Sequence, residues 1–419
     1  MKRQRVGFLN RVRQSQRLLR DDGPSALVDR VRHRLADKIR PSGAGKLEVS
    51  RRDFVRSAKF ARDGWRLPGP APRRAGDQLT IGWVCTPPGP GSGGHTTMFR
   101  MVAALEDAGH RCVVYLQDQH GWSIEQHRHT IRQWWPWVSA EVRDYEAGVE
   151  DCQVLFATSW ATAYAILGSD AKGIRAYFVQ DFEPDFAPAG SESLLAEATY
   201  RFGFYGVTAG RWLAELLERD YGMTAESFDF GCDLDNYYLD RQVAPERRTG
   251  VCYYCRPSTP RRAHELAMLA LDFFAERHPQ IDIHLFGEPI ARPHFPAIHH
   301  GLLAPADLGR LYNRCIAGLV LSATNVSLVP YEMLAAGCIP VVNDAEHNRL
   351  VLANDHVAYA NATPYDLAEA LVELVDRSAD ERVVAADVAA ASVKATTWTA
   401  ASEQFVRIVE RMVETRCQE

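Results

Sequence analysis

The sequence has no long apolar run. Its longest uncharged apolar stretch near the centre is CIAGLVLSA at residues 315–323, and a membrane-spanning helix needs roughly 20 such residues. No apolar segment typical of a secretory signal follows the basic first residues. We therefore expect a chain that folds in the cytoplasm.

Paired cysteine motifs are also scarce. The nine cysteines are scattered and odd in number, which favours reduced thiols over a disulfide framework. Cys252 and Cys255 form a C-x-x-C within an apparent strand, where positions i and i+3 face opposite sides, and no second C-x-x-C accompanies them. We expect small core residues here and no metal site.

Acidic residues are few at the start of the chain. Residues 1–75 carry 21 Lys and Arg against 7 Asp and Glu, with Leu, Val and Ile at roughly helical spacing. A basic amphipathic arm over residues 1–65 suits an anionic membrane surface, and a solvated basic arm is the alternative. Nucleic acid is not an expected partner, because no recognisable nucleic-acid module accompanies the charge.

After a Pro- and Gly-rich linker at 66–77, strands and helices alternate, which predicts an α/β protein with parallel sheets. The arm and linker (1–75) precede two Rossmann-like domains (76–240 and 241–400) that face a cleft, and a C-terminal helix (401–419) follows. The core segments with strand character are 78–85, 111–117, 152–159, 175–181, 203–209, 251–256, 281–287, 316–323 and 338–344.

The loop after the first strand is rich in glycine. Gly89, Gly91 and Gly94 match G-x-G-x-x-G between a strand and a helix, and Asp118 follows the second strand. Such a loop lets a phosphate approach the backbone at a helix start. One interpretation is therefore an NAD(P)-dependent oxidoreductase with Asp118 on the ribose. Any other phosphorylated ligand, or a plain tight turn, fits the same pattern.

The second domain begins with a basic cluster, and a later, largely apolar segment of it contains one acid, Glu332. Arg256 closes a strand and Arg261 precedes a helix, so the pair forms a diphosphate clamp or remains solvated. In SLVPYEMLAAG we expect Ser327 to cap a helix whose free N–H groups meet a phosphate. Glu332 then accepts hydrogen bonds from a ribose or is only an acid favoured by the helix dipole.

These segments together resemble the GT-B glycosyltransferases of family 4. YEMLAAGCIPVV looks like the family's LEAMAAGxPVV, and FGCDLDNYY looks like its interdomain element. PGPGSGGHTTMFR, YFVQDFEP and CRPSTPRRAHEL look closer still to the rhamnosyltransferases of the WsaF type, which build bacterial surface glycans. The resemblance covers residues 78–400.

The resemblance implies roles for individual residues. Glu332 matches the ribose-binding second glutamate of E-x7-E, Arg256 and Arg261 match the basic pair on the donor diphosphate, and Gly93 and Gly94 match the glycines beside it. The remaining implied donor-site positions are Thr324, Ser327 and Leu328.

This chain departs from the family pattern at three places, one of which is Ser327 in place of the family's usual glycine. Thr324 stands where the family has a glutamate that contacts the donor sugar, which suits a deoxy sugar such as rhamnose. The family's usual histidine is absent, and Asp181 and Glu183 are the candidate catalytic carboxylates in its place, binding the acceptor hydroxyl or taking its proton.

We therefore expect a retaining, metal-independent transferase that moves L-rhamnose from dTDP-L-rhamnose to a glycan or lipid-linked acceptor. It needs no cofactor and, through its basic arm, associates with the inner membrane face. A non-catalytic nucleotide-sugar-binding protein with the same donor site is a further alternative.

Overall fold

The computed structural model describes residues 49–62, 67, 69–71, 77–89, 91–118, 121–243 and 248–416. The compact unit to which they belong begins at Val49. No helix within these residues combines the length and the apolar character needed to cross a membrane. Residues 1–48, which hold most of the expected basic arm, lie outside the described residues.

A seven-stranded parallel sheet forms the N-terminal half, in the order β3-β2-β1-β4-β5-β6-β7. The first strand lies inside this sheet. The strand order runs from β1 to β3 on one side and from β4 to β7 on the other, so the loops that follow β1 and β4 diverge at the carboxyl ends of these two strands. The strands are β1 (Thr80–Cys85), β2 (Arg111–Leu116), β3 (Glu141–Asp144), β4 (Val154–Ala157), β5 (Ile174–Val179), β6 (Tyr205–Ala209) and β7 (Ala225–Phe228).

Alternating side chains of β1 divide between two cores, as the period of two in a strand requires. Ile81 and Trp83 pack with α4 (Gly93–Asp107), α5 (Ile124–Trp134) and α15 (Trp398–Arg416) on one face. Val84 packs on the other face with α6 (Trp160–Leu167), α7 (Ser191–Thr199) and α8 (Arg211–Tyr221). Because both faces are covered, central strands such as β1 and β4 are largely apolar.

The short helix α3 (Arg51–Arg62) also belongs to the N-terminal half. It packs on α6, and its buried Asp53 accepts a hydrogen bond from Gln117 Nε2 at 2.8 Å. Part of the segment that the sequence assigned to the arm is therefore built into the first domain.

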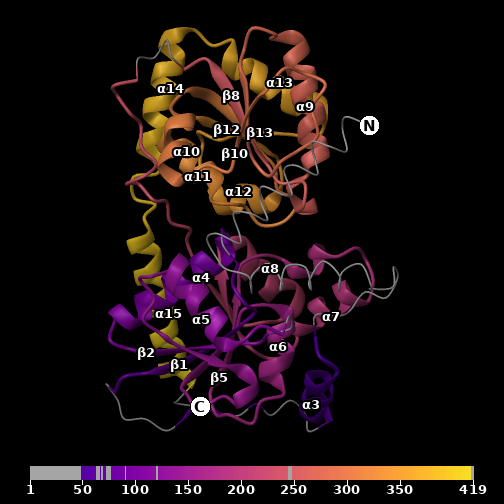
Figure 1. The fold of residues 1–419 in the computed structure, drawn as a ribbon, viewed down its shortest axis with the longest axis vertical. Coiled ribbons are helices and arrows are strands. Elements are labelled where there is room, and N and C mark those ends of the chain that lie inside the picture. Colours follow the sequence, from indigo (N-terminus) through magenta and orange to yellow (C-terminus); the bar gives the residue numbers. More distant parts are fainter. Residues whose placement is uncertain are drawn as a thin grey trace, which may run out of the picture. The chain divides into compact units, whose positions relative to one another are not determined.

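The C-terminal half repeats the same architecture with a six-stranded parallel sheet in the order β10-β9-β8-β11-β12-β13. Helices α9 and α13 lie side by side on one face (Figure 1). The strands are β8 (Gly250–Cys255), β9 (Ile283–Gly287), β10 (Ile298–Gly301), β11 (Cys315–Val320), β12 (Ile339–Asn343) and β13 (Ala358–Ala360). The helices are α9 (His264–Arg277), α10 (Pro305–Tyr312), α11 (Val329–Ala335), α12 (Glu346–Leu352), α13 (Pro364–Val375) and α14 (Ala379–Ser392).

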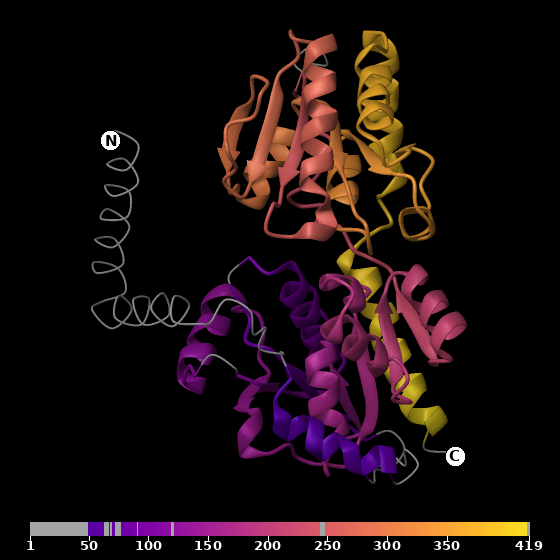
Figure 2. The same cartoon turned by 90° about the vertical axis from the view of Figure 1, so that its right-hand side faces the viewer.

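The last helix, α15, returns to the first sheet (yellow in Figures 1 and 2). Phe405 lies within 6.0 Å, between ring centroids, of four aromatic side chains of that sheet, namely Trp83, Phe156, Phe178 and Phe228. The chain therefore connects the halves twice. At these connections Cys232 pairs with Thr397, and a side chain at Gly231 would lie 2.6 Å from the Trp398 backbone.

The structure confirms the expected α/β class and both parallel sheets. Every core segment that the sequence assigned as a strand lies at β1, β2, β4, β5, β6, β8, β9, β11 or β12. The four edge strands, β3, β7, β10 and β13, were not predicted.

Candidate functional site

Loops from both sheets enclose a cavity of about 540 Å³. They follow β1, β4 and β5 in the N-terminal half and β8, β9 and β11 in the C-terminal half, so the cavity lies at the carboxyl ends of both sheets, where α/β proteins bind ligands. The cavity brings together nine of the ten predicted site residues: Gly93, Gly94, Asp181, Glu183, Arg256, Arg261, Ser327, Leu328 and Glu332.

The glycine loop leaves one wall of the cavity open. Helix α4 begins at Gly93, directly after Ser92, whose side chain caps it by accepting from the His95 N–H. A Cβ placed on Gly93 meets nothing within 4 Å, and one on Gly94 meets the side-chain amide of Gln180, whose Nε2 is the nearest atom at 3.5 Å. Neither glycine is required by packing, so the loop has room for the close approach of a ligand.

His95 is a cavity residue that the sequence reasoning missed. Its ring nitrogens lie 2.8 Å from Ser92 Oγ and 3.1 Å from the Thr86 carbonyl oxygen. Burial lowers the pKa of His95, which favours the neutral imidazole. Its position directly after Gly93 and Gly94 was the available signal.

Three arginines converge from the β8–α9 loop. Arg256 donates from Nη1 to the Tyr254 hydroxyl at 2.9 Å and forms an ion pair with Glu288 at 3.1 Å. Arg261 lies over the Phe186 ring, with its guanidinium carbon 4.2 Å from the ring centroid. Both side chains line the cavity with part of their surface exposed, so their remaining N–H groups are available to an anion.

Arg262 has a different task. Its Nη1 donates to Ser322 Oγ at 2.6 Å and to the Asn325 carbonyl oxygen at 3.2 Å, and burial lowers its pKa to about 10. This side chain holds the loop after β11 in place.

Glu332 lies in α11 and lines the cavity. Its side chain accepts from the Tyr312 hydroxyl at a long 3.4 Å, and burial raises the pKa of Glu332 to about 7. A carboxylate that is partly desolvated and weakly partnered is poised to accept hydrogen bonds from a ligand.

The cap of α11 differs from the prediction. The N-cap position is Leu328 rather than Ser327, and no side chain caps this helix of seven residues. Pro330 in the first turn has no N–H to satisfy, which explains how the helix starts without a side-chain cap. Ser327 still lines the cavity.

The two candidate catalytic carboxylates are both buried and engaged with the protein. Asp181 Oδ1 accepts from the N–H groups of Phe182 and Asn325, each at 2.9 Å, and its Oδ2 accepts from Arg261 Nε at 2.9 Å. Glu183 accepts from the Trp160 N–H at 2.6 Å and from the Tyr177 hydroxyl at 2.8 Å.

Thr324 is the predicted donor-site residue that does not line the cavity. It is buried, and its Oγ1 has no hydrogen-bond partner within the described part of the chain. The β11–α11 loop reaches the cavity wall two residues later, at Val326 and Ser327.

Other predicted features lie away from the cavity. The Asp118 carboxylate accepts from the Trp122 N–H at 2.6 Å and lies 3.6 Å from His127, so it does not contribute to the cavity wall. The eight described cysteines are buried free thiols, which confirms the expected core role of Cys252 and Cys255. The described residues contain no group of three or more His, Cys, Asp or Glu side chains suited to a metal.

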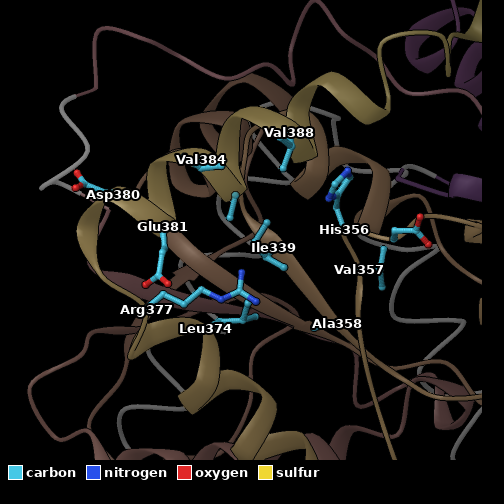
Figure 3. Close-up of a pocket in the computed structure, with 12 residues that line it drawn as sticks. Ile339, His356, Val357, Ala358, Leu374, Arg377, Asp380, Glu381, Val384 and Val388 are labelled. Atoms are coloured by element: carbon cyan, nitrogen blue, oxygen red, sulfur yellow. The ribbon is translucent and has the colours of Figure 1, made fainter.

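A second cavity, of about 660 Å³, lies in the C-terminal half, where Val384 and Val388 of α14 and Arg377 lie around Ile339 (Figure 3). Ile339 and Ala358 are the first residues of β12 and β13, so this cavity is at the amino ends of the strands. None of the predicted site residues lines it.

The two facing sheets and the cavity at their carboxyl ends define the GT-B fold. Among solved structures with this arrangement, sucrose-phosphate synthase of Thermosynechococcus elongatus superposes with a TM-score of 0.60 at 11% identity, covering 81% of this chain and 100% of that one. Anabaena HepE in complex with UDP-glucose gives 0.60 at 12% identity, covering 80% and 100%. The lipopolysaccharide glycosyltransferase WaaG gives 0.55 at 12%, covering 78% and 99%.

Two sequence comparisons show similarity to a WsaF domain and to an O-antigen biosynthesis protein. Residues 249–372 match the family described as WsaF, C-terminal domain. The O-antigen biosynthesis protein RfbC of Myxococcus xanthus is 32% identical over 263 residues, which are 61% of this chain and 20% of that protein. This chain thus aligns with about a fifth of the length of that curated relative.

Proposed function

We propose that this protein is a glycosyltransferase of surface-polysaccharide biosynthesis that takes L-rhamnose from dTDP-L-rhamnose. The observation that carries the proposal is the convergence of an open glycine loop, two partly exposed arginines and a weakly partnered carboxylate on one cavity from two sheets. Similarity to the WsaF C-terminal domain and to an O-antigen biosynthesis protein supports it.

Each of these groups has a role in the proposed reaction. Arg256 and Arg261 bind the donor diphosphate and stabilise the negative charge that develops as it leaves. Gly93 and Gly94 admit the diphosphate to the backbone, and Glu332 accepts hydrogen bonds from the ribose hydroxyls. The reaction retains the anomeric configuration without a metal ion.

The donor sugar is proposed from the β11–α11 loop. Thr324 stands at the position of the sugar-binding glutamate in the resembling family, and its side chain is buried behind the cavity wall. With no acid at this position to bind a hydroxyl of a glucose-type sugar, the proposed donor is a deoxy sugar.

A panel of dTDP-L-rhamnose, UDP-glucose, GDP-mannose and NADH tests the proposal, with binding and donor hydrolysis both measured. We expect dTDP-L-rhamnose to bind most tightly and to be hydrolysed slowly without acceptor, also in the presence of EDTA. Tight NADH binding without a nucleotide-sugar response would instead establish an oxidoreductase. Donor binding without hydrolysis or transfer to any glycan acceptor would leave a nucleotide-sugar-binding protein.

The acceptor is proposed to be a glycan or lipid-linked glycan, with the basic arm holding the protein at an anionic membrane surface. The truncation that tests this should remove residues 1–48 and keep α3, which packs on α6. We expect the full chain to float with phosphatidylglycerol vesicles and the truncated chain to stay behind. Equal flotation of both would contradict a role for the arm.

A further inference from the structure

One fully buried side chain, Asn325, forms polar contacts between the two halves. It lies in the loop after β11. Its Nδ2 donates to the carbonyl oxygens of Gln180 at 2.9 Å and Ala209 at 2.8 Å, which belong to the ends of β5 and β6 in the N-terminal half. Both N–H groups of this amide are therefore used across the boundary between the halves.

Asp181 receives two further contacts from the C-terminal half. The Asn325 backbone N–H donates to Asp181 Oδ1 at 2.9 Å, and Arg261 Nε donates to Asp181 Oδ2 at 2.9 Å. These donors come from different loops, after β11 and after β8. A single carboxylate thus joins the end of β5 to both loops that supply the proposed donor site.

The contact with Asp181 also orients Arg261. With Nε bound to Asp181 and the guanidinium carbon held over the Phe186 ring, the two Nη groups are left for another acceptor. Arg261 lines the cavity with its side chain 28% exposed. A guanidinium fixed at Nε in this way is preorganised for a diphosphate, since little of its rotamer freedom remains to be lost on binding.

The loop that carries Asn325 is itself rigid. Ser322 Oγ donates to the Asn325 carbonyl oxygen at 2.6 Å, and the Ser322 N–H donates to Asn343 Oδ1 at 2.9 Å. Together with Arg262 on the same carbonyl, these bonds fix Asn325 before the halves meet.

We propose that Asn325 and Asp181 form an interdomain latch, in which Asn325 holds the halves closed and Asp181 acts as a positioning residue for Arg261. The closing of the halves rests on the contacts alone. The role of Arg261 toward a diphosphate rests on the proposed function. In this arrangement the apparent affinity for the donor is proportional to the fraction of molecules that are latched, because an open protein binds only after closing.

The first test measures closure without any nucleotide. Spin labels are attached to two introduced cysteines, Glu218→Cys in α8 and Glu276→Cys in α9, in a Cys417→Ser background. They report the distance between the halves. We expect Asn325→Ala to lengthen and broaden that distance, because the buried carbonyls of Gln180 and Ala209 lose their donor, while the backbone N–H of residue 325 still reaches Asp181. Asn348→Ala is the matched control, since this buried asparagine donates within the C-terminal half, to the Asn343 carbonyl at 2.7 Å. An unchanged distance in Asn325→Ala would overturn the latch.

The second test measures positioning, with dTDP and UDP as probes and dTDP-L-rhamnose in turnover. Asp181→Asn keeps the shape of the side chain but removes its charge. The amide then offers Arg261 Nε either a neutral oxygen or an NH2 group, which cannot accept the hydrogen bond. We expect a ten-fold or greater rise in Kd for the nucleoside diphosphates and in the donor KM, with kcat changed by less than three-fold. A loss confined to kcat would make Asp181 a catalytic base and overturn its positioning role.

The two arms fail separately. If the wild-type protein binds neither nucleotide, the diphosphate role of Arg261 falls with the proposed function, while the spin-label distances still decide whether the latch exists. Thermal unfolding of each variant, compared with Asn348→Ala, separates loss of closure from loss of folding.

Discussion

The carboxylates of the two halves differ in how far the protein satisfies them. In the N-terminal half, Asp181 and Glu183 accept short hydrogen bonds on both oxygens. In the C-terminal half, the carboxylate of Glu332 accepts one long hydrogen bond within the described residues, from Tyr312, and its pKa is raised. A satisfied buried acid supports the structure, whereas an unsatisfied one at a cavity wall gains most from a ligand.

The largest expected effect comes from removing a carboxylate whose hydrogen bonds are satisfied by the protein. Glu183→Ala leaves the Trp160 N–H and the Tyr177 hydroxyl without acceptors, and each buried orphan costs about 1–3 kcal/mol. We expect the free energy of unfolding to fall by about 3 kcal/mol in urea denaturation, with donor affinity unchanged while the protein is folded. Normal stability with lost turnover would show instead that Glu183 is catalytic.

Replacing the unsatisfied acid should have the opposite pattern. Glu332→Gln keeps the shape but loses a charged acceptor, and such bonds are worth about 1 kcal/mol more than neutral ones. We expect donor Kd to rise about ten-fold in calorimetry, while stability at pH 8 stays level or increases because a desolvated charge is gone. Reduced stability without a change in Kd would contradict the assignment to the ribose.

The same acid predicts a pH dependence. Its folded pKa of about 7 is above the ordinary value of 4.5, so its stabilising contribution is fully present below about pH 4.5 and is lost as the pH rises through 7. We expect wild-type stability to decline across this window relative to Glu332→Gln. Donor binding needs the ionised form and should release protons near pH 7, which calorimetry in buffers of different ionisation enthalpy detects. Equal proton release by Glu332→Gln would assign the protons to another group.

The smallest effect on folding is expected at the glycine loop. Gly93→Ala adds a methyl group that meets nothing and favours the first turn of α4 by about 0.5–1 kcal/mol. We expect unchanged or slightly higher thermal stability but several-fold weaker donor binding. Gly82→Ala is the contrasting variant, since its Cβ would lie 2.7 Å from Leu155 Cδ1 and should lower stability. Unaltered donor affinity in Gly93→Ala would make this loop an ordinary turn.

The sequence predicts the buried parts of this fold and misses its edges. Central strands such as TIGWVC are continuous apolar runs because helices cover both faces. The four edge strands are short, and several are polar, as in EVRD (Glu141–Asp144) and IHHG (Ile298–Gly301). Pairing on one side only leaves little hydrophobic pattern for a reader of the sequence to detect.

The site shows a similar division. Glycines, arginines and Glu332 follow strand ends, so their meeting at one cavity follows from the parallel topology. The partners of Asp181 do not follow from it, because Asn325 and Arg261 reach that carboxylate from loops 144 and 80 residues away in sequence. Ser327 was misassigned as a cap because Pro330 makes a side-chain cap unnecessary there.

The return of α15 to the first sheet has a consequence for biosynthesis. Trp83, Phe156 and Phe178 complete their aromatic core only when Phe405 arrives, after both sheets have been translated. During synthesis the N-terminal half therefore leaves the ribosome with an open apolar groove, which chaperones would recognise as unfinished. The core of the C-terminal half does not wait for α15. Although this half is made later, it should be the first of the two to reach its native packing.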